Sequence, residues 1–170
     1  MPKKIENVRA LLICEAKRLL KQDGYSKLTM RSVANACGLG VGTAYNYFSS
    51  KDMLIASFML EDWLSALAKM NACTAVGVEK VECVYQTLRE FIVQNQTLFA
   101  DSSAKKSYST GISTWHKTLR EQLAKAVLPA CLGVENSGFV SQFIADSLLS
   151  WSAEGIEFSL LKPIINKLLY

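Results

Sequence analysis

The chain has 170 residues, half of them hydrophobic, which is enough to form a core in one or two small domains and excludes a disordered chain. Its formal net charge of +4 is unevenly spread, because residues 1–52 carry nine Lys or Arg against four acidic residues while the remainder is close to neutral. A basic N-terminal third is typical of a segment that meets a polyanion, although a solvated basic surface gives the same count.

The cysteines and the N-terminus indicate the compartment. Five cysteines without a Cys-x-x-Cys pair do not fit a secreted disulfide framework, so we expect them to be reduced and mostly buried. The N-terminus interleaves charged and apolar residues, unlike a signal peptide, and no run of about 18 apolar residues predicts a membrane span. We therefore expect a cytoplasmic protein with no membrane partner.

The first third predicts three helices separated by tight turns. The first helix ends at Gly24 and carries an apolar stripe at spacings of three and four, formed by Ile5, Val8, Leu12, Ala16 and Leu19. Thr29 is suited to N-cap a second short helix, without the Glu that completes a capping box, and Gly38 is suited to end that helix in a left-handed conformation. A third helix over 41–47 completes the order of a helix-turn-helix.

The remainder also shows helical periodicity and no strand pattern, so the fold class is all-α. Ser49 or Ser50 is suited to cap a fourth helix that runs to about Asn71, and further helices are predicted over 78–92 and 112–126. We expect the segment 139–158 to be a helix that is apolar on more than one face and packs against its own domain and a partner chain. Pro163 suits the first turn of a last helix.

The third helix and its turn combine small residues with uncharged donors. Glycines there allow close approach to a DNA duplex, hydroxyl and amide groups contact it, and Ala44 and Val41 offer apolar contact. Arg31 and Lys51 flank this uncharged stretch and are placed to neutralise phosphates. The residues that we expect to contact DNA on these grounds are Arg31, Gly40, Val41, Gly42, Thr43, Tyr45, Asn46, Tyr47 and Lys51.

These residues carry a family resemblance. Over about residues 5–55 the chain resembles the N-terminal domain of the tetracycline-repressor-like (TetR) family of bacterial transcription regulators. The resemblance lies in Gly24-Tyr25, Leu28-Thr29-Met30, Val33-Ala34, Cys37-Gly38-Leu39 and, most specifically, Gly42-Thr43-x-Tyr45-x-Tyr47-Phe48-x-x-Lys51-Asp52, followed by Leu54. The chain departs from the family at Gly40, where Ser is common, and at Cys37, where a small residue is usual.

The resemblance implies an all-α protein of about nine helices, with a helix-turn-helix domain at 1–50 and a regulatory and dimerisation domain at 51–170. It implies a homodimer that binds a pseudo-palindromic operator and responds to a small-molecule effector, with repression as the family's commoner habit. It adds Thr29 as a phosphate contact beside Lys51, assigns Tyr45 and Tyr47 to the DNA backbone and base edges, and places Asn46 and Val41 where such proteins vary their readout.

Two further sets of residues are candidates for the effector pocket and the dimer interface. Aromatic residues of the middle helices could line a pocket, although such spacing equally describes a plain core: Tyr85, Phe91, Phe99, Tyr108, Trp115 and His116. The apolar segment 139–158 supplies the expected dimer interface: Phe139, Val140, Phe143, Ile144, Ser147, Leu148, Trp151 and Gly155.

Two other classes of function compete with a ligand-responsive regulator. No motif for nucleophilic, metal or phosphoryl chemistry is visible, so we expect neither an enzyme nor a metal site or cofactor. An adaptor or co-activator of the same fold, which binds proteins and has no small-molecule effector, remains the alternative.

Overall fold

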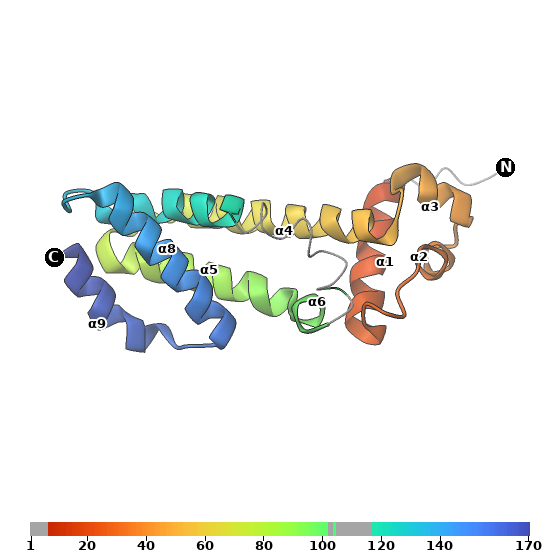
Figure 1. The fold of residues 1–170 in the computed structure, drawn as a ribbon. Helices are drawn as coiled ribbons and strands as arrows, with labels where there is room; N and C mark the ends of the chain where they lie inside the picture. The colour runs from red at the N-terminus through yellow and green to blue at the C-terminus, as the bar shows by residue number, and fades with distance from the viewer. Residues whose placement is uncertain (1–6, 102–103, 105–116) are drawn as a thin grey trace. The chain divides into compact units, whose positions relative to one another are not determined.

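The computed structural model describes residues 7–101, 104 and 117–170, and within these residues every regular element is a helix (Figure 1). The all-α prediction is thereby confirmed. The elements in order are α1 (Val8–Asp23), α2 (Met30–Ala36), α3 (Val41–Tyr47), α4 (Lys51–Ala72), α5 (Gly77–Gln94), α6 (Gln96–Ala100), helical residues 117–127, η1 (Leu128–Cys131), α8 (Ser137–Glu154) and α9 (Phe158–Leu169). In the described part of the chain no helix has the length and apolarity that a membrane crossing requires.

The chain divides into two compact units, which are described separately. The first comprises the described residues of Met1–Glu61 and Asn95–Tyr108, and the second those of Asp62–Gln94 and Ser109–Tyr170. The helix α4 runs without interruption from one unit into the other.

The first unit is built on α1, which contacts both α2 and α6, while α2 contacts α3. Its core includes Leu12 and Ala16 of α1, as predicted, but Ile13 and Leu20 are buried where Leu19 was expected, and Leu19 is only half-buried. The core also contains residues from much later in the chain, because Leu98 of α6 is buried among these helices. Gly24 ends α1 as predicted.

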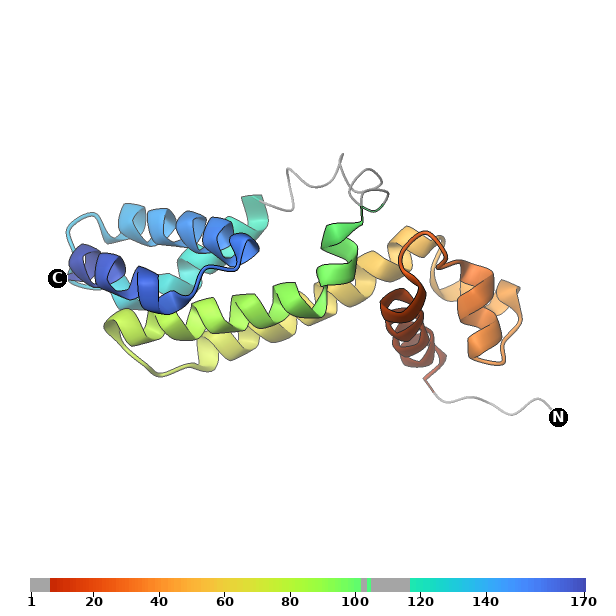
Figure 2. The ribbon, with the colours of Figure 1, turned by 90° about the horizontal axis from the view of Figure 1, so that it is seen from below.

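The second unit packs α8, α9 and η1 around α5 (Figure 2). The Tyr85 side chain of α5 is buried, and its hydroxyl donates a hydrogen bond of 2.6 Å to the Ile156 carbonyl. Lys80 is also buried, and its ammonium donates to the carbonyls of Met70 and Cys73 at 2.5 and 2.8 Å. Carbonyls at the end of α4, which lack helical partners, are thus satisfied by a charged donor.

Two expectations about the last helices are wrong. The apolar segment 139–158 is not one helix, because α8 ends at Gly155 in the left-handed conformation, with φ 77°, and Phe158 begins α9. Pro163 lies inside α9 instead of in its first turn, since that helix begins five residues earlier. The sequence pattern did not reveal this break, because Gly155 was read as a small residue of the apolar face.

Candidate functional site

The helix α2 is capped at both ends by its own local sequence. The Thr29 hydroxyl accepts a hydrogen bond of 3.0 Å from the Ser32 amide, and the Ser32 hydroxyl accepts one of 3.0 Å from the Thr29 amide. The predicted N-cap is therefore confirmed, and a capping box forms with Ser in place of Glu. This box was not predicted from the sequence, because the residue expected at position 32 was Glu, whose side chain is longer than that of Ser.

The turn between α2 and α3 is set by Gly38, which adopts φ 65°. The Leu39 amide donates to the Ala34 carbonyl at 2.9 Å, and the Gly38 amide donates to Asn35 at 3.0 Å, which together form a Schellman motif. Gly40 then N-caps α3 without a side-chain hydrogen bond. These bonds fix the start of α3 relative to α2.

The helix α3 has one buried face and one exposed face. Ala44 is fully buried and Phe48 nearly so, which anchors α3 to the core. Ala44 therefore cannot offer the apolar DNA contact expected of it. Tyr45 and Tyr47 remain 52% and 48% exposed, although large aromatic side chains are usually covered. The exposed face is completed by Val41, Gly42 and Asn46.

Gly42 lies in this exposed face with open space around it. A Cβ atom built on Gly42 would meet no atom within 4 Å, and its backbone is helical. Neither packing nor backbone conformation therefore requires glycine at this position, and Gly costs a helix about 1 kcal/mol relative to Ala. The absence of a side chain leaves the main chain of α3 accessible.

Lys51 begins α4 and is held against Tyr25. Its ammonium lies 3.8 Å from the centroid of the Tyr25 ring and donates to the Tyr25 carbonyl at 3.2 Å. The Tyr25 hydroxyl in turn donates to Asp52 at 2.7 Å. Ser50 accepts from the Met53 amide at 3.1 Å, which confirms it as a cap of α4. The ammonium group has three donor hydrogens, and the Tyr25 carbonyl accepts one of them.

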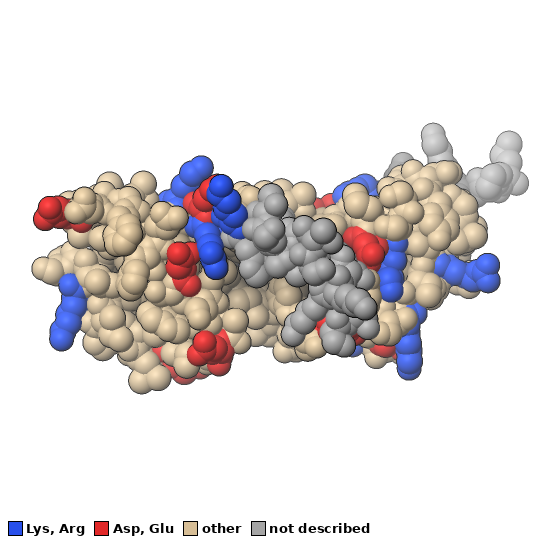
Figure 3. Space-filling view, viewed as in Figure 1, with Lys and Arg blue, Asp and Glu red and all other residues tan. Residues whose placement is uncertain are grey.

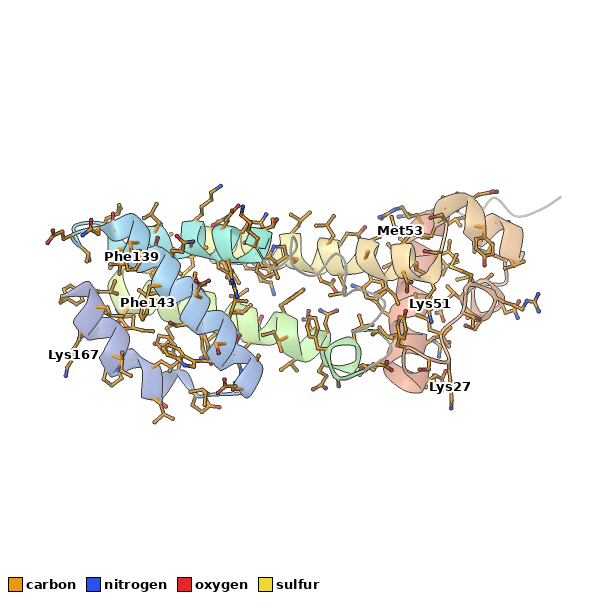
Figure 4. All side chains as sticks on the ribbon, in the orientation of Figure 1. Lys27, Lys51, Met53, Phe139, Phe143 and Lys167 are labelled. Carbon is orange, nitrogen blue, oxygen red and sulfur yellow. The ribbon has the colours of Figure 1, made fainter. Side chains whose placement is uncertain are left out.

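The other polar and basic residues of the expected interface lie on the surface of the same unit. Thr29 and Arg31 are exposed at the start of α2, and Thr43 is half-buried in α3. Lys27 is exposed between α1 and α2 (Figure 4) and is a basic residue that the sequence reading did not single out. Figure 3 shows Lys and Arg side chains projecting from this unit, on its right-hand side.

The described aromatic residues of the expected effector pocket belong to two different units. Tyr85 and Phe91 are buried in the core of the second unit, where Phe91 makes an edge contact with Trp63 at 5.2 Å between ring centroids. Phe99 belongs to the other unit and is partly exposed. Tyr108, Trp115 and His116 lie outside the described residues.

A polar hollow of about 240 Å³ lies between α4 and α5 in the second unit. Among the aromatic candidates that the structure describes, only Phe91 lines it. Lys69 and Glu90 form an ion pair of 3.6 Å at this hollow. Its lining is Asp62, Ser65, Ala66, Lys69, Thr87, Glu90, Phe91 and Gln94.

The expected dimer residues of α8 separate into two faces. Ile144 and Leu148 are fully buried in the core of their own unit, and Val140 and Trp151 pack against that core. Phe139 and Phe143 are instead 73% and 51% exposed and project from α8 (Figure 4). Ser147 is half-buried, and Gly155 is exposed beyond the helix end. The sequence reading missed that α9 adds two exposed apolar residues, Leu160 and Ile164.

Residues 12–58 match the family model described as bacterial regulatory proteins, tetR family. A curated relative, the HTH-type transcriptional regulator UidR of Escherichia coli K12, is 28% identical over 71 residues. The aligned segment is 42% of this chain and 36% of UidR. The UidR of Shigella flexneri matches with the same values.

Solved structures match nearly the whole chain. Salmonella enterica GusR has a TM-score of 0.66 at 21% identity and covers 98% of both chains. The fatty acid degradation regulator FadR of Bacillus halodurans has a TM-score of 0.59 at 17% identity, covering 98% of this chain and 96% of its own. A TetR-like regulator of Rhodococcus sp. RHA1 has a TM-score of 0.56 at 16% identity, covering 97% and 95%. Residues 12–58 thus carry a segment similar to the bacterial regulatory proteins of the tetR family, and the chain has the fold of these solved structures.

Proposed function

We propose that this chain is a ligand-responsive transcription regulator, a repressor, that binds a pseudo-palindromic operator in the cytoplasm as a homodimer and has no enzymatic activity. The exposed face of α3 is the observation that carries the proposal. Tyr45 and Tyr47 stand in solvent beside a glycine that the fold does not require, on a helix anchored by Ala44 and Phe48. A helix-turn-helix places such a surface in the major groove.

We assign three roles to the residues of this surface. Arg31, Lys51 and the Thr29 hydroxyl contact phosphates, which position the protein without reading sequence. Tyr45 and Tyr47 contact the DNA backbone and base edges, and the Thr43 hydroxyl donates alongside them. Gly40 and Gly42 permit close approach, while Val41 and Asn46 contribute to sequence discrimination.

Fluorescence anisotropy with DNA that flanks the chain's own gene tests the DNA-binding proposal. We expect Tyr45→Ala to abolish specific binding, while Leu132→Ala, which also truncates an exposed side chain, leaves it unchanged. Arg31 and Lys51 in two protomers neutralise four phosphates, which predicts that affinity falls about 10²-fold between about 50 and 200 mM salt. Weak binding that ignores salt and Tyr45 would favour the protein-binding adaptor instead.

The exposed apolar residues of α8 and α9 support the homodimer. Phe139, Phe143, Leu160 and Ile164 are large apolar side chains that a second copy would remove from water. Charged replacements of Ile144 or Leu148 would test folding instead of association, because both side chains are buried in their own core.

Light scattering of Phe143→Glu tests the dimer. We expect this variant to be monomeric, because a carboxylate buried in an apolar interface without a partner is costly. Leu132→Glu, an equally drastic change at another exposed apolar residue, should leave the dimer intact. If Phe143→Glu is still a dimer, the interface does not include this face of α8.

The hollow between α4 and α5 supports the effector. It offers two carboxylates, an ammonium and amide and hydroxyl groups, which suit a small polar molecule better than a purely apolar one. Its α4 residues lie in the same continuous helix as Lys51, so ligand contacts can bias that helix and thereby DNA binding. An effector that releases DNA from the wild type and from Leu132→Ala, but not from Thr87→Leu, would place the effector in this hollow.

A further inference from the structure

The side chain of Tyr25 connects the turn after α1 with the first turn of α4. Tyr25 follows Gly24, whose φ of 81° is a conformation that side chains rarely adopt, while a Cβ built there would meet no atom within 4 Å. The backbone conformation, and not packing, therefore requires glycine before Tyr25. The Tyr25 side chain is 4% exposed and belongs to the core of the first unit, which fixes the position of its ring.

Two neighbouring residues of α4 bind different parts of Tyr25. The Lys51 ammonium lies 3.8 Å from the ring centroid and donates to the Tyr25 carbonyl at 3.2 Å (Figure 4). The Asp52 carboxylate accepts a hydrogen bond of 2.7 Å from the Tyr25 hydroxyl. The ring and the carbonyl that hold Lys51 are both uncharged, so they order its side chain without neutralising its positive charge.

Two other cations of the first unit lie over aromatic rings at longer distances. The Arg9 guanidinium carbon is 5.6 Å from the centroid of the Phe48 ring, and the Lys17 ammonium is 5.4 Å from that of Phe58. Attraction between a cation and a ring is electrostatic, so it is stronger at the shorter distance. Of these three cations, Lys51 is therefore the one that a ring holds most closely.

An ordered lysine binds a phosphate more tightly than a freely moving one. Fixing a lysine side chain costs conformational entropy, and this cost weakens any contact that the ammonium makes. When the side chain is already ordered in the free protein, the cost falls on folding and not on binding. The support that Tyr25 gives to Lys51 therefore has a consequence for any phosphate that Lys51 meets.

We propose that Tyr25 is a positioning residue for DNA binding, which holds the Lys51 ammonium ready for a DNA phosphate. This inference rests on the proposed function, in which Lys51 is assigned to a phosphate. Tyr25 is buried and acts through Lys51, without touching DNA itself. The aromatic ring carries this role, because the carbonyl is present whatever residue stands at position 25 and the hydroxyl binds Asp52.

A double-mutant cycle in the anisotropy titration tests the role of the ring. Tyr25→Leu removes the ring, and the Kd should rise about three- to tenfold for each protomer, because ordering a free lysine side chain costs up to about that factor. In a Lys51→Met background the same replacement should change the Kd by less than about twofold, whereas a purely structural effect would add to that of Lys51→Met. Tyr25→Phe keeps the ring and should bind within about twofold of the wild type.

The salt dependence distinguishes positioning from contact. Lys51→Met removes one phosphate contact from each protomer, so the slope of log affinity against log salt should fall by about 2 for a dimer. Tyr25→Leu should leave this slope unchanged, because the ammonium is still present and only its order is lost.

Phe58→Leu is the matched control for the loss of a buried ring. Phe58 is 1% exposed in the same core and lies under Lys17, to which no DNA contact is assigned. This variant should bind DNA like the wild type, and circular dichroism verifies that every variant is folded. A rise in Kd as large as that of Tyr25→Leu would show that any loss of a core ring weakens binding, and would overturn the proposal.

An NMR spectrum of the free protein measures the position of Lys51 without DNA. The ring current of Tyr25 should shift the Lys51 ε-methylene signal upfield in the wild type and in Tyr25→Phe, but not in Tyr25→Leu, and Lys51→Met assigns the signal by its loss. An unshifted signal in the wild type, or additive effects in the cycle, would overturn the positioning role and leave DNA binding in place. A wild type that binds no DNA would instead overturn the proposed function, and with it any role of Tyr25 in binding.

Discussion

Gly42→Ala should raise stability and weaken DNA binding at once. The added methyl group meets nothing within 4 Å, and Ala stabilises a helix interior by about 1 kcal/mol relative to Gly. For a chain of this size that gain corresponds to a Tm about 2–4 °C higher. The same methyl group would stand between α3 and the duplex. If it breaks one charge-assisted hydrogen bond to phosphate in each protomer, at about 1.5–3 kcal/mol per bond, the Kd rises about 10²- to 10⁴-fold.

Thermal unfolding by circular dichroism and anisotropy titration measure the two effects on the same preparation. Ala68→Gly, at an exposed position of α4, is the matched control, because it should lower the Tm by a similar amount and leave the Kd unchanged. If Gly42→Ala raises the Tm and also raises the Kd, its weaker DNA binding cannot be explained by a loss of folded protein. Unchanged DNA affinity in a stabilised Gly42→Ala protein would refute the close-approach role of this glycine.

Three further changes test the architecture. Gly40→Ser should raise the free energy of unfolding by about 0.5–1 kcal/mol in urea titrations, since its φ of −66° suits any residue and a hydroxyl can cap α3; no gain would show that the cap is already satisfied. Lys80→Met should lower that free energy by about 2–4 kcal/mol, because two carbonyls lose a charged donor; a loss below about 1 kcal/mol would mean that water replaces it. Tyr85→Phe should cost about 1 kcal/mol at neutral pH through the lost hydrogen bond to Ile156. Burial raises the pKa of Tyr85, so as the pH rises past the unfolded value of 10.0 the wild type loses a contribution to stability that Tyr85→Phe lacks, and the difference between the two proteins should shrink there; parallel pH curves would contradict this.

The parts of the fold that the sequence predicted are those specified locally. Thr29, Gly38 and the 41–47 helix depend on hydrogen bonds between residues at most five positions apart, so their signals are visible in a short window. The capping box was missed because Ser32 performs with a short side chain what Glu usually does. The break at Gly155 was missed because this glycine was read as a small residue of an apolar helix face.

The parts that the sequence did not predict depend on contacts between distant segments. Periodicity identified two apolar seams in α8, but it could not tell that Ile144 faces the core of its own unit while Phe143 faces solvent. The aromatic residues of the expected pocket were grouped by type, and the structure distributes Tyr85 and Phe99 between two units.

The burial of Leu98 in the first unit has a consequence for modularity. Cutting the chain after Glu61 would leave behind α6, and with it Leu98 and Ala104, both of which belong to the core around α1. Exposing one leucine of this kind costs about 1.5–3 kcal/mol, a large share of the stability of a small domain. The first unit is therefore not a module that can be separated from the chain by a cut after Glu61. A chimera in which the second unit is replaced should therefore keep residues 95–104 together with residues 1–61. A chimera made with a single junction after Glu61 would lack the later segment, and with it part of the first unit's core.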